Sequence, residues 1–469
     1  MSMPATRTER DSLGEVPVPA DAYYGVHTVR AVDNFAVTGS TIGQFPQLVA
    51  ALAAVKQAAA LANRDLGLLD ARRADAIAAA CTEIRRGALH DQFRVDPIQG
   101  GAGTSTNMNA NEVIANRALE ILGSPRGSYH ELDPLAHVNL GQSTNDVYPT
   151  AINVCLVGYL RLLSESLERL AVAFDEKAAE FADVLKMGRT QLQDAVPMTL
   201  GQEFATYGIM LREDRERLAE GAGLLLESNL GGTAIGTGIT GHPEYSARAC
   251  AHLREITGEA VVPAANLVEA TQDCGAFVLV SGILKRVAVK LSKTCNDLRL
   301  ISSGPTTGLG EINLPAVQAG SSIMPGKVNP VIPELVNQVA FEVIGNDVTV
   351  TMAAEAGQLQ LNAFEPIIAY SMMSSAAHLA AAVDTLTTRC VSGITANRDH
   401  LEQGVRRSPG LVTALVPFIG YPTSARIAKQ ALATGENVGD IVVAEGLLTR
   451  EQVDKILSPR QLTDFSTAP

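Results

Sequence analysis

Four stretches of the chain gather side chains that donate hydrogen bonds without carrying charge, and three of them contain glycine. They are Gly100–Asn109, Gln142–Asp146, Gly188–Ala195 and Gly320–Pro330. A helical pattern follows each of the first two, so their hydroxyls and N–H groups gather at helix N-termini, which bind anions. A helix cap alone would need only one Ser or Thr. We therefore expect a carboxylate or phosphate site, with an ordinary capped turn as the alternative.

The last two stretches add amides and a positive charge. Gly188–Ala195 joins two predicted long helices, and a satisfied hydrogen-bond network at a bundle end is the alternative to a ligand site. Gly320–Pro330 holds two Gly and two Pro, which predicts a mobile loop with defined turns. Such a loop can close over a ligand and exclude water. Lys327 near its end would supply the charge that holds an anionic substrate.

Other chemistries lack their sequence signatures. No Gly-x-Gly-x-x-Gly follows a predicted strand, no Walker A motif occurs, and the eight His residues show no metal-ligand spacing. The chain has no Ala-Ser-Gly tripeptide, from which lyases of aromatic amino acids build an electrophilic cofactor. We expect neither a cofactor nor a bound metal.

The composition of the chain indicates which binding partners and which cellular compartment to expect. The net charge of -13 disfavours binding to nucleic acid. The six Cys residues include no Cys-x-x-Cys pair, so we expect buried, reduced thiols. Thr6–Asp11 is polar and charged, unlike the apolar region of a signal peptide, and the apolar run Cys274–Leu284 is too short to span a bilayer. These features predict a cytoplasmic protein that does not bind membranes.

Long helices must position the polar stretches. In Thr150–Leu185, apolar residues recur at steps of three and four. Four more ranges show similar patterns: 199–229, 264–302, 333–354 and 364–395. Pro333 suits the first turn of its helix. Five such helices predict a mainly α protein built on a helix bundle.

The helix lengths, and the way helical patterns are distributed along the chain, suggest how the protein is divided into domains and subunits. A helix of roughly 30 residues spans about 45 Å, more than one domain needs, so we expect contacts with other subunits. A monomeric bundle is the alternative. We predict an N-terminal domain at 1–142, a central helix-bundle domain at 143–395 and a small C-terminal domain at 396–469.

Together, the four stretches resemble the aspartase/fumarase superfamily. The loop GSSIMPGKVNP at 320–330 is its hallmark, and the similarity includes DAYYGVHT at 21–28, GAGTSTNMNANEVIAN at 101–116 and GRTQLQDAVPMTLGQEF at 188–204. The resemblance implies a three-domain, mainly α subunit with a central long-helix bundle. It also implies a homotetramer with active sites shared between subunits, and a small dicarboxylate or amino-acid substrate.

Within the superfamily, the chain resembles aspartases more than class II fumarases. Fumarases usually carry His where this chain has Gln191, and usually read Gly-Asn-Phe-Glu-Leu-Asn where Gly357–Asn362 reads GQLQLN. Loss of hydroxide needs a proton donor, whereas ammonium leaves as neutral ammonia, and Gln cannot act as an acid. We expect reversible elimination of ammonia from L-aspartate to give fumarate. A fumarase, or a lyase for a substituted aspartate, is the alternative.

The resemblance also implies roles for individual residues. Ser321 would be the base that removes the proton next to a carboxylate, which becomes a doubly charged aci form. Four hydroxyls would bind that carboxylate: those of Thr104, Ser143, Thr144 and Ser322. The other carboxylate would bind Thr190, Lys327 and Asn329, and the ammonium would bind Asn145 and Gln191.

Two further points concern the same loop. A Ser alkoxide needs stabilisation, which backbone N–H groups and Lys327 would supply once the loop closes. Glu334 belongs to a His–Glu pair in the family, and Gln191 replaces that His, so the role of Glu334 stays open. A structural protein that kept the fold but lost catalysis would show damage in residues 320–330, and this loop is intact.

Overall fold

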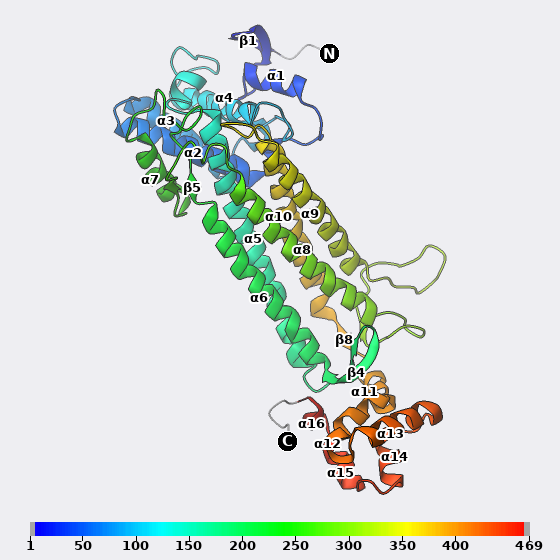
Figure 1. The fold of residues 1–469 in the computed structure, drawn as a ribbon. Helices are drawn as coiled ribbons and strands as arrows, with labels where there is room; N and C mark the ends of the chain where they lie inside the picture. The colour runs from blue at the N-terminus through cyan, green and yellow to red at the C-terminus, as the bar shows by residue number, and fades with distance from the viewer. Residues whose placement is uncertain (1–4, 464–469) are drawn as a thin grey trace. The chain divides into compact units, whose positions relative to one another are not determined.

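The computed structural model describes residues 5–463, and these form a mainly helical protein (Figure 1). Five helices are long: α5 (Thr144–Glu180), α6 (Leu200–Leu224), α8 (Gly275–Ile301), α9 (Val331–Glu355) and α10 (Glu365–Arg389). They correspond to the five helical patterns of the sequence, which confirms the predicted fold class. Pro333 lies in the first turn of α9, as predicted.

The chain divides into two compact units, and each long helix contributes residues to both. The first unit runs to Ser164 and includes Glu216–Ala288 and Phe341–His378. The second comprises Glu165–Arg215, Val289–Ala340 and the chain from Leu379 onward. The three-domain division therefore stays a prediction, and each unit is described by itself.

In the first unit, short helices surround the Ala-rich helix α2, which packs against α3 and α7. Most Ala side chains of α2 are buried, because their small size lets the neighbouring helices approach closely. The shorter helical elements of this unit are α1 (Val26–Asn34), η1 (Ile42–Gln44), α2 (Pro46–Asp65), α3 (Ala71–Arg85), η2 (His90–Gln92), α4 (Thr104–Ile121), η3 (Pro134–Val138) and α7 (Tyr245–Thr257). Its strands form an antiparallel pair and a parallel pair: β1 (Thr6–Asp11) with β2 (Gly14–Pro19), and β5 (Glu227–Ser228) with β6 (Val262–Pro263).

In the second unit, short C-terminal helices pack around a small apolar core that includes Leu415, Ile427 and Val442. These elements are η4 (Val391–Gly393), α11 (Arg398–Arg407), η5 (Pro409–Leu415), α12 (Val416–Ile419), α13 (Tyr421–Thr434), α14 (Val438–Ala444), α15 (Arg450–Ile456) and α16 (Pro459–Thr463). Two antiparallel pairs complete the unit: β3 (Leu185–Thr190) with β4 (Gln193–Thr199), and β7 (Ile312–Asn313) with β8 (Thr395–Ala396).

The expected helix–helix turn at Gly188–Ala195 is wrong, because this segment belongs to the β3–β4 hairpin. Its two tip residues, Gln191 and Leu192, have φ values of +54° and +64°. Two-residue hairpin turns need such left-handed angles, and Asn-Gly is the usual sequence signal for them. Gln-Leu does not carry that signal, so the local sequence hid the turn.

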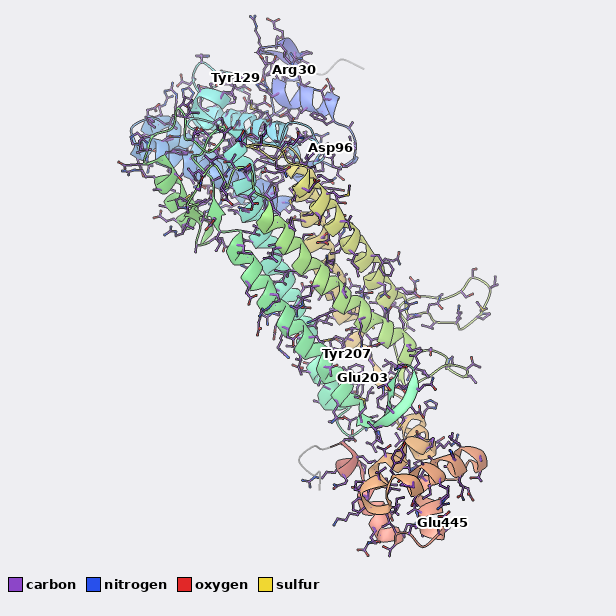
Figure 2. The ribbon with its side chains drawn as sticks, viewed as in Figure 1. Arg30, Asp96, Tyr129, Glu203, Tyr207 and Glu445 are labelled. Atoms are coloured by element: carbon purple, nitrogen blue, oxygen red, sulfur yellow. The ribbon has the colours of Figure 1, made fainter. Side chains whose placement is uncertain are left out.

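An aromatic cluster holds the base of this hairpin against α5 and α6. Phe204 packs edge-on against Phe181 and Phe174, with ring centroids 5.3 Å and 5.9 Å apart. Tyr207 lies one turn further along α6 and joins the cluster (Figure 2). Such pairs contribute roughly 0.5–1.5 kcal/mol each beyond burial, so the cluster stabilises the helix ends from which the hairpin extends.

All six Cys residues are buried and free, as predicted. The run Cys274–Leu284 belongs to the start of α8, where Val280 and Leu284 are buried. Two helical stretches, Thr144–Glu180 and Glu365–Gly393, are long and apolar enough to cross a membrane by length and composition alone. In each, 67% of the most apolar window is buried, as expected for core helices of a bundle.

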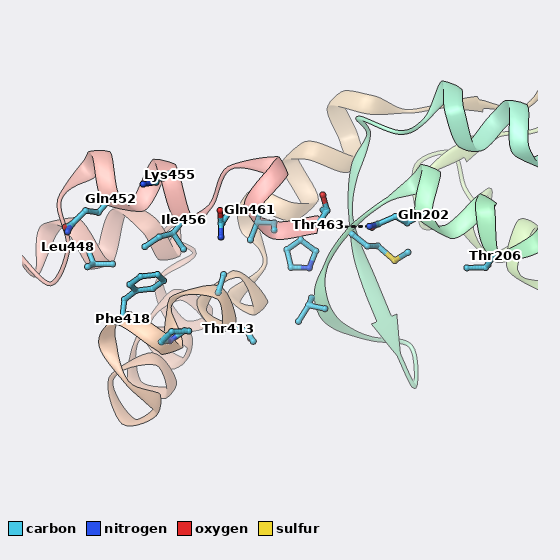
Figure 3. A pocket seen from close by; sticks show the side chains of 16 residues that line it. Gln202, Thr206, Thr413, Phe418, Leu448, Gln452, Lys455, Ile456, Gln461 and Thr463 are labelled. Atoms are coloured by element: carbon cyan, nitrogen blue, oxygen red, sulfur yellow. Dashed lines mark hydrogen bonds between the residues drawn. The ribbon is translucent and has the colours of Figure 1, made fainter. Parts of the chain in front are cut away.

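A cavity of about 910 Å³ lies in the second unit between β4, the start of α6 and helices α12, α15 and α16 (Figure 3). Its walls are largely apolar and include Met198, Phe418 and Ile456. The side-chain amide of Gln202 donates to the Thr463 carbonyl at 2.8 Å, which ties α16 to α6. None of the residues predicted to bind substrate lines this cavity.

Candidate active site

The predicted site residues fall in both units. Thr104, Ser143, Thr144 and Asn145 belong to the first unit, and the remaining six belong to the second: Thr190, Gln191, Ser321, Ser322, Lys327 and Asn329. The structure brings together the members of the first group at the starts of α4 and α5. Among the described residues, no hydrogen bond joins the hairpin tip at Thr190 and Gln191 to the loop at 320–330.

Helix α4 begins at Thr104, inside the polar stretch Gly100–Asn109 rather than after it as expected. Gly103 precedes it with φ of +88°, and a Cβ there would lie 2.4 Å from the Tyr148 ring, so only glycine fits. Thr104 donates its hydroxyl to the Gly101 carbonyl at 2.7 Å. In this first turn Thr104 is exposed and Ser105 is half-buried, whereas Thr106 and Asn107 are buried. The N–H groups of Thr104, Thr106 and Asn107 already have acceptors within the chain.

Helix α5 begins at Thr144, and its first residue contacts α4. The Asn107 side-chain N–H donates to the Thr144 hydroxyl oxygen at 3.0 Å. Because this oxygen accepts, the Thr144 proton is left to point at another acceptor. Ser143, the residue before, accepts from the Asn145 backbone N–H at 3.2 Å. Both hydroxyls can therefore donate to a carboxylate at the helix start.

A buried cation lies beneath this cluster. The fully buried Lys56 ammonium donates to the side-chain oxygens of Asn139 and Gln142, at 2.8 Å and 2.9 Å. The Asn139 oxygen also accepts from Asn107 and Asn111. Burial lowers the pKa of Lys56 to about 7. The sequence reading missed this residue, because a single Lys in an Ala-rich helix gives no local sign of burial.

Asp146 bonds to backbone groups of its own turn and of a distant segment. Its buried carboxylate accepts backbone N–H bonds from Ser143, Gly231 and Thr233, each at 3.0 Å. Burial raises its pKa to about 6. Asp146 thereby fixes the start of α5 to a glycine-rich segment at 229–241, which the sequence reading also missed.

The glycine-rich segment completes the surroundings of Asn145. Pro149 lacks an N–H, so the Asn145 carbonyl has no partner within the helix, and the Asn229 amide donates to it at 2.9 Å. The Asn145 side-chain N–H donates to the Ala234 carbonyl at 2.7 Å. The Asn145 amide oxygen is then left as an acceptor, which suits an ammonium. The density of glycine in 229–241 was the signal that could have revealed this segment.

In the second unit, Thr190 and Gln191 are exposed at the hairpin tip. Strand β3 contributes two residues to a cluster of four charged side chains. Lys186 is buried and pairs with Glu203 at 2.5 Å and Glu311 at 2.6 Å, and Arg189 also pairs with Glu311. Glu203 lies in the first turn of α6 (Figure 2).

The loop at 320–330 folds around the Ser321 hydroxyl. This oxygen accepts backbone N–H bonds from Ile323 at 3.2 Å and Met324 at 3.0 Å. The Gly320 N–H donates to the Lys327 carbonyl at 2.8 Å, and a Cβ at Gly320 would lie 2.4 Å from that oxygen. Two donors on one hydroxyl oxygen stabilise negative charge there, as a serine base needs.

The other predicted loop residues differ in their contacts. Ser322 and Lys327 are exposed, and among residues 5–463 Lys327 makes no ion pair. One N–H of the Asn329 amide donates to the Gly320 carbonyl at 2.7 Å, so this amide also closes the loop. Glu334 lies 3.9 Å from Arg299, and both side chains are partly exposed, so this contact assigns Glu334 no role. Among residues 5–463, no group of three or more His, Cys, Asp or Glu could hold a metal ion.

Comparison with known proteins agrees with this geometry. The lyase family model matches residues 14–345, and the model described as the fumarase C C-terminus matches residues 411–464. The chain therefore belongs to the aspartase/fumarase superfamily of lyases, as its motifs predicted.

Its relatives include aspartate ammonia-lyases. That of Pseudomonas fluorescens is 60% identical over 97% of this chain and 96% of its own length. Those of Helicobacter pylori and Escherichia coli K12 are 55% and 54% identical over 97% of this chain and 97% and 96% of their own lengths.

Solved structures share the fold over nearly the whole chain. A protein from Brucella melitensis, described as fumarate lyase:delta crystallin bound to cobalt, matches with a TM-score of 0.95 and 56% identity. The match covers 99% of this chain and all of that one. The class II fumarase of Schistosoma mansoni matches with a TM-score of 0.93 and 36% identity, covering 98% of this chain and 99% of its own.

Proposed function

We propose that the chain is an aspartate ammonia-lyase that reversibly converts L-aspartate to fumarate and ammonia. The relatives at 54–60% identity over nearly the full length carry this activity in their names. The structural observation that supports it most directly is the Ser321 hydroxyl, which accepts two backbone N–H groups inside the loop. No step of the proposed reaction needs a cofactor.

In the proposed reaction, the Ser321 alkoxide takes the proton from the carbon next to one carboxylate. The electron pair of that C–H bond moves into the carboxylate, which becomes the aci form with two negative charges. Collapse of this form makes the carbon–carbon double bond and breaks the C–N bond. The nitrogen leaves as neutral ammonia and keeps its own protons, so no general acid is required.

Neutral donors around the carboxylate suit this mechanism, because charge grows there in the transition state. The hydroxyls of Ser143, Thr144 and Ser322 would donate to its oxygens, and the Thr104 hydroxyl would do so by giving up its present bond to the Gly101 carbonyl. The Asn107 bond to Thr144 supports this role, since it leaves the Thr144 proton available. The buried amine of Lys56 beneath these helix starts, whose pKa burial lowers to about 7, would add positive potential when it is protonated.

The rest of the substrate would bind polar groups of the second unit and the start of α5. Lys327 would hold the distal carboxylate together with Thr190 and Asn329. Asn145 and Gln191 would accept hydrogen bonds from the ammonium. The Asn145 contact with the Ala234 carbonyl supports the assignment, because it leaves the amide oxygen as the free acceptor.

We also propose a cytoplasmic homotetramer in which each active site combines residues from different subunits. Mixing an inactive Thr104→Ala variant with an inactive Ser321→Ala variant should then restore part of the activity. A mixture that stays inactive after verified subunit exchange would indicate that each site is built from one chain.

The assay that tests the function offers the purified protein L-aspartate, L-malate and 3-methylaspartate, and follows the products by NMR. Fumarate release from L-aspartate, without comparable fumarate from L-malate or comparable methylfumarate from 3-methylaspartate, would support the proposal. The second candidate function is fumarate hydration, favoured by the likeness to the Schistosoma mansoni fumarase. Malate formed from fumarate without ammonia, as fast as aspartate with ammonia, would favour that function.

A further inference from the structure

Glu311 lies between two segments that carry predicted substrate-binding residues. Along the chain it directly precedes β7, which leads to the loop at 320–330. Its side chain faces the β3–β4 hairpin, whose tip carries Thr190 and Gln191. Only 2% of Glu311 is exposed, so its carboxylate depends on protein partners rather than on water.

The carboxylate of Glu311 pairs with two cations of strand β3. One oxygen lies 2.6 Å from the ammonium of Lys186, and the other pairs with the guanidinium of Arg189. Arg189 is the residue immediately before Thr190. These two contacts therefore hold the last residues of β3, from which the hairpin tip projects.

The backbone of Glu311 is fixed independently of its side chain. Its N–H donates to the Ile301 carbonyl at 2.8 Å, and its carbonyl accepts from the Asn397 N–H at 2.9 Å. These bonds attach Glu311 to the end of α8 and to the residue that follows β8. These backbone bonds fix the position of Glu311 and hence of its carboxylate. A change in its side-chain contacts with the hairpin need not move the 320–330 loop.

We propose that Glu311 is a positioning residue that holds Thr190 and Gln191 where they bind the substrate. This inference rests on the proposed ammonia-lyase function and adds a residue that does not itself contact the substrate. A Gln at this position keeps the shape but removes the charge, so Lys186 and Arg189 are no longer both compensated. The hairpin tip should shift, while Ser321, the proposed proton-abstracting base in the 320–330 loop, stays in place.

The proposal separates substrate binding from the chemical step. Glu311→Gln should raise the KM for L-aspartate at least tenfold and change kcat by less than threefold, because Thr190 and Gln191 hold substrate and transition state alike. Glu203→Gln is the matched control. Glu203 also pairs with Lys186 but makes no ion pair with Arg189, so its KM should stay within threefold of the wild type.

A double-mutant cycle tests whether Glu311 acts through Arg189. If it does, Glu311→Gln, Arg189→Met and the double variant should show about the same KM, because each of them removes the Glu311–Arg189 pair. Independent roles would give multiplied effects and would overturn this route.

Arg189→Met alone serves as the second variant if Glu311→Gln does not fold. Arg189 is partly exposed, so its loss leaves the buried Lys186–Glu311 pair intact. An unchanged KM in folded Glu311→Gln, or in Arg189→Met, would overturn the proposal while the wild type still deaminates aspartate. A wild type that does not deaminate aspartate would instead overturn the function itself.

Discussion

The side-chain amide of Asn107, in the first turn of α4, donates a hydrogen bond to the hydroxyl oxygen of Thr144, the first residue of α5, over 3.0 Å. The bond ties two helix N-termini together and decides which way the Thr144 proton can point. An acceptor at position 107 would reverse that direction, because the hydroxyl would then donate to it.

Asn107→Asp should therefore lower kcat/KM for L-aspartate about 10²-fold, the usual loss when one donor to a developing oxyanion is removed. Asn111→Asp is the control, because Asn111 contacts the same Asn139 oxygen but not Thr144, and adds the same charge nearby. Steady-state kinetics at one pH compare the two. Equal losses in both variants would indicate a charge effect rather than the orientation of Thr144.

Ser321→Ala should lower kcat by at least roughly 10³-fold, because the base that removes the proton is lost. Melting temperature and oligomeric state should not change, since the Ser321 hydroxyl serves only its own loop. Ser302→Ala is the control, a hydroxyl that bonds the Arg299 carbonyl. Exchange of the substrate C–H proton with deuterated water, followed by NMR, reports on the same step. Exchange at the wild-type rate would assign the base to another group.

Lys327→Ala should raise the KM for L-aspartate about 10²-fold, because an exposed charge that makes no ion pair within residues 5–463 is free to bind a carboxylate. Lys429→Ala, on the surface of α13, is the control and should have no effect. Raising the salt concentration should weaken wild-type binding more than that of Lys327→Ala. A variant with a near-normal KM would remove Lys327 from the substrate site.

Glu112 makes the stability of the protein depend on pH. Its buried carboxylate accepts from the backbone N–H groups of Gly25, His27 and Thr28 and from the Thr28 hydroxyl. Burial outweighs these donors and raises its pKa from 4.5 to about 7. Between these two values the folded state binds more protons at this site than the unfolded state, so stability falls as the pH rises.

The Glu112 contribution to the free energy of unfolding should thus drop by on the order of 3 kcal/mol between pH 4.5 and 7. Glu112→Gln lacks a titratable group at this position. The unfolding free energy of the wild type minus that of the variant, measured by urea denaturation at several pH values, should fall as the pH rises through that window. A difference that stays constant, or grows with pH, would contradict the raised pKa.

Much of the fold could be predicted from local sequence, because helix periodicity and polar caps act over a few residues. The five long helices, Pro333 in the first turn of α9 and the buried Cys residues follow such patterns. Lys56 and Asp146 show where prediction from local sequence fails. Whether a lone charge is buried, and what it bonds to, depends on chain segments as distant as Asn139 and Gly231.

The candidate site was predictable only as a set of motifs. The sequence indicated which residues gather at helix starts and in the loop, and their roles stay predictions. It did not indicate that residues 188–195 form a hairpin, because a register of paired strands depends on distant contacts and the turn lacked its usual Asn-Gly. The ion pairs of Glu311 were invisible for the same reason.

The role proposed for Gln191 is to determine which leaving group the site accepts. The wild type should deaminate L-aspartate and should not hydrate fumarate at a comparable rate, because Gln cannot donate the proton that hydroxide needs. Gln191→His should remain an aspartate lyase and gain at most weak malate dehydration. NMR of fumarate incubated with and without ammonia identifies the products. Malate formed by the wild type as fast as aspartate would rule out this role.

The left-handed backbone at the hairpin tip limits which residues evolution can place at this position. A φ of +54° at Gln191 strongly disfavours branched side chains such as Val, Ile and Thr, whereas Asn, Asp and His adopt such angles more readily than most. Amide and imidazole can therefore replace each other here without refolding the turn. Gln and His codons differ by one base, so under the proposed role of Gln191 a single nucleotide change can introduce a proton donor at the hairpin tip, with the scaffold left untouched.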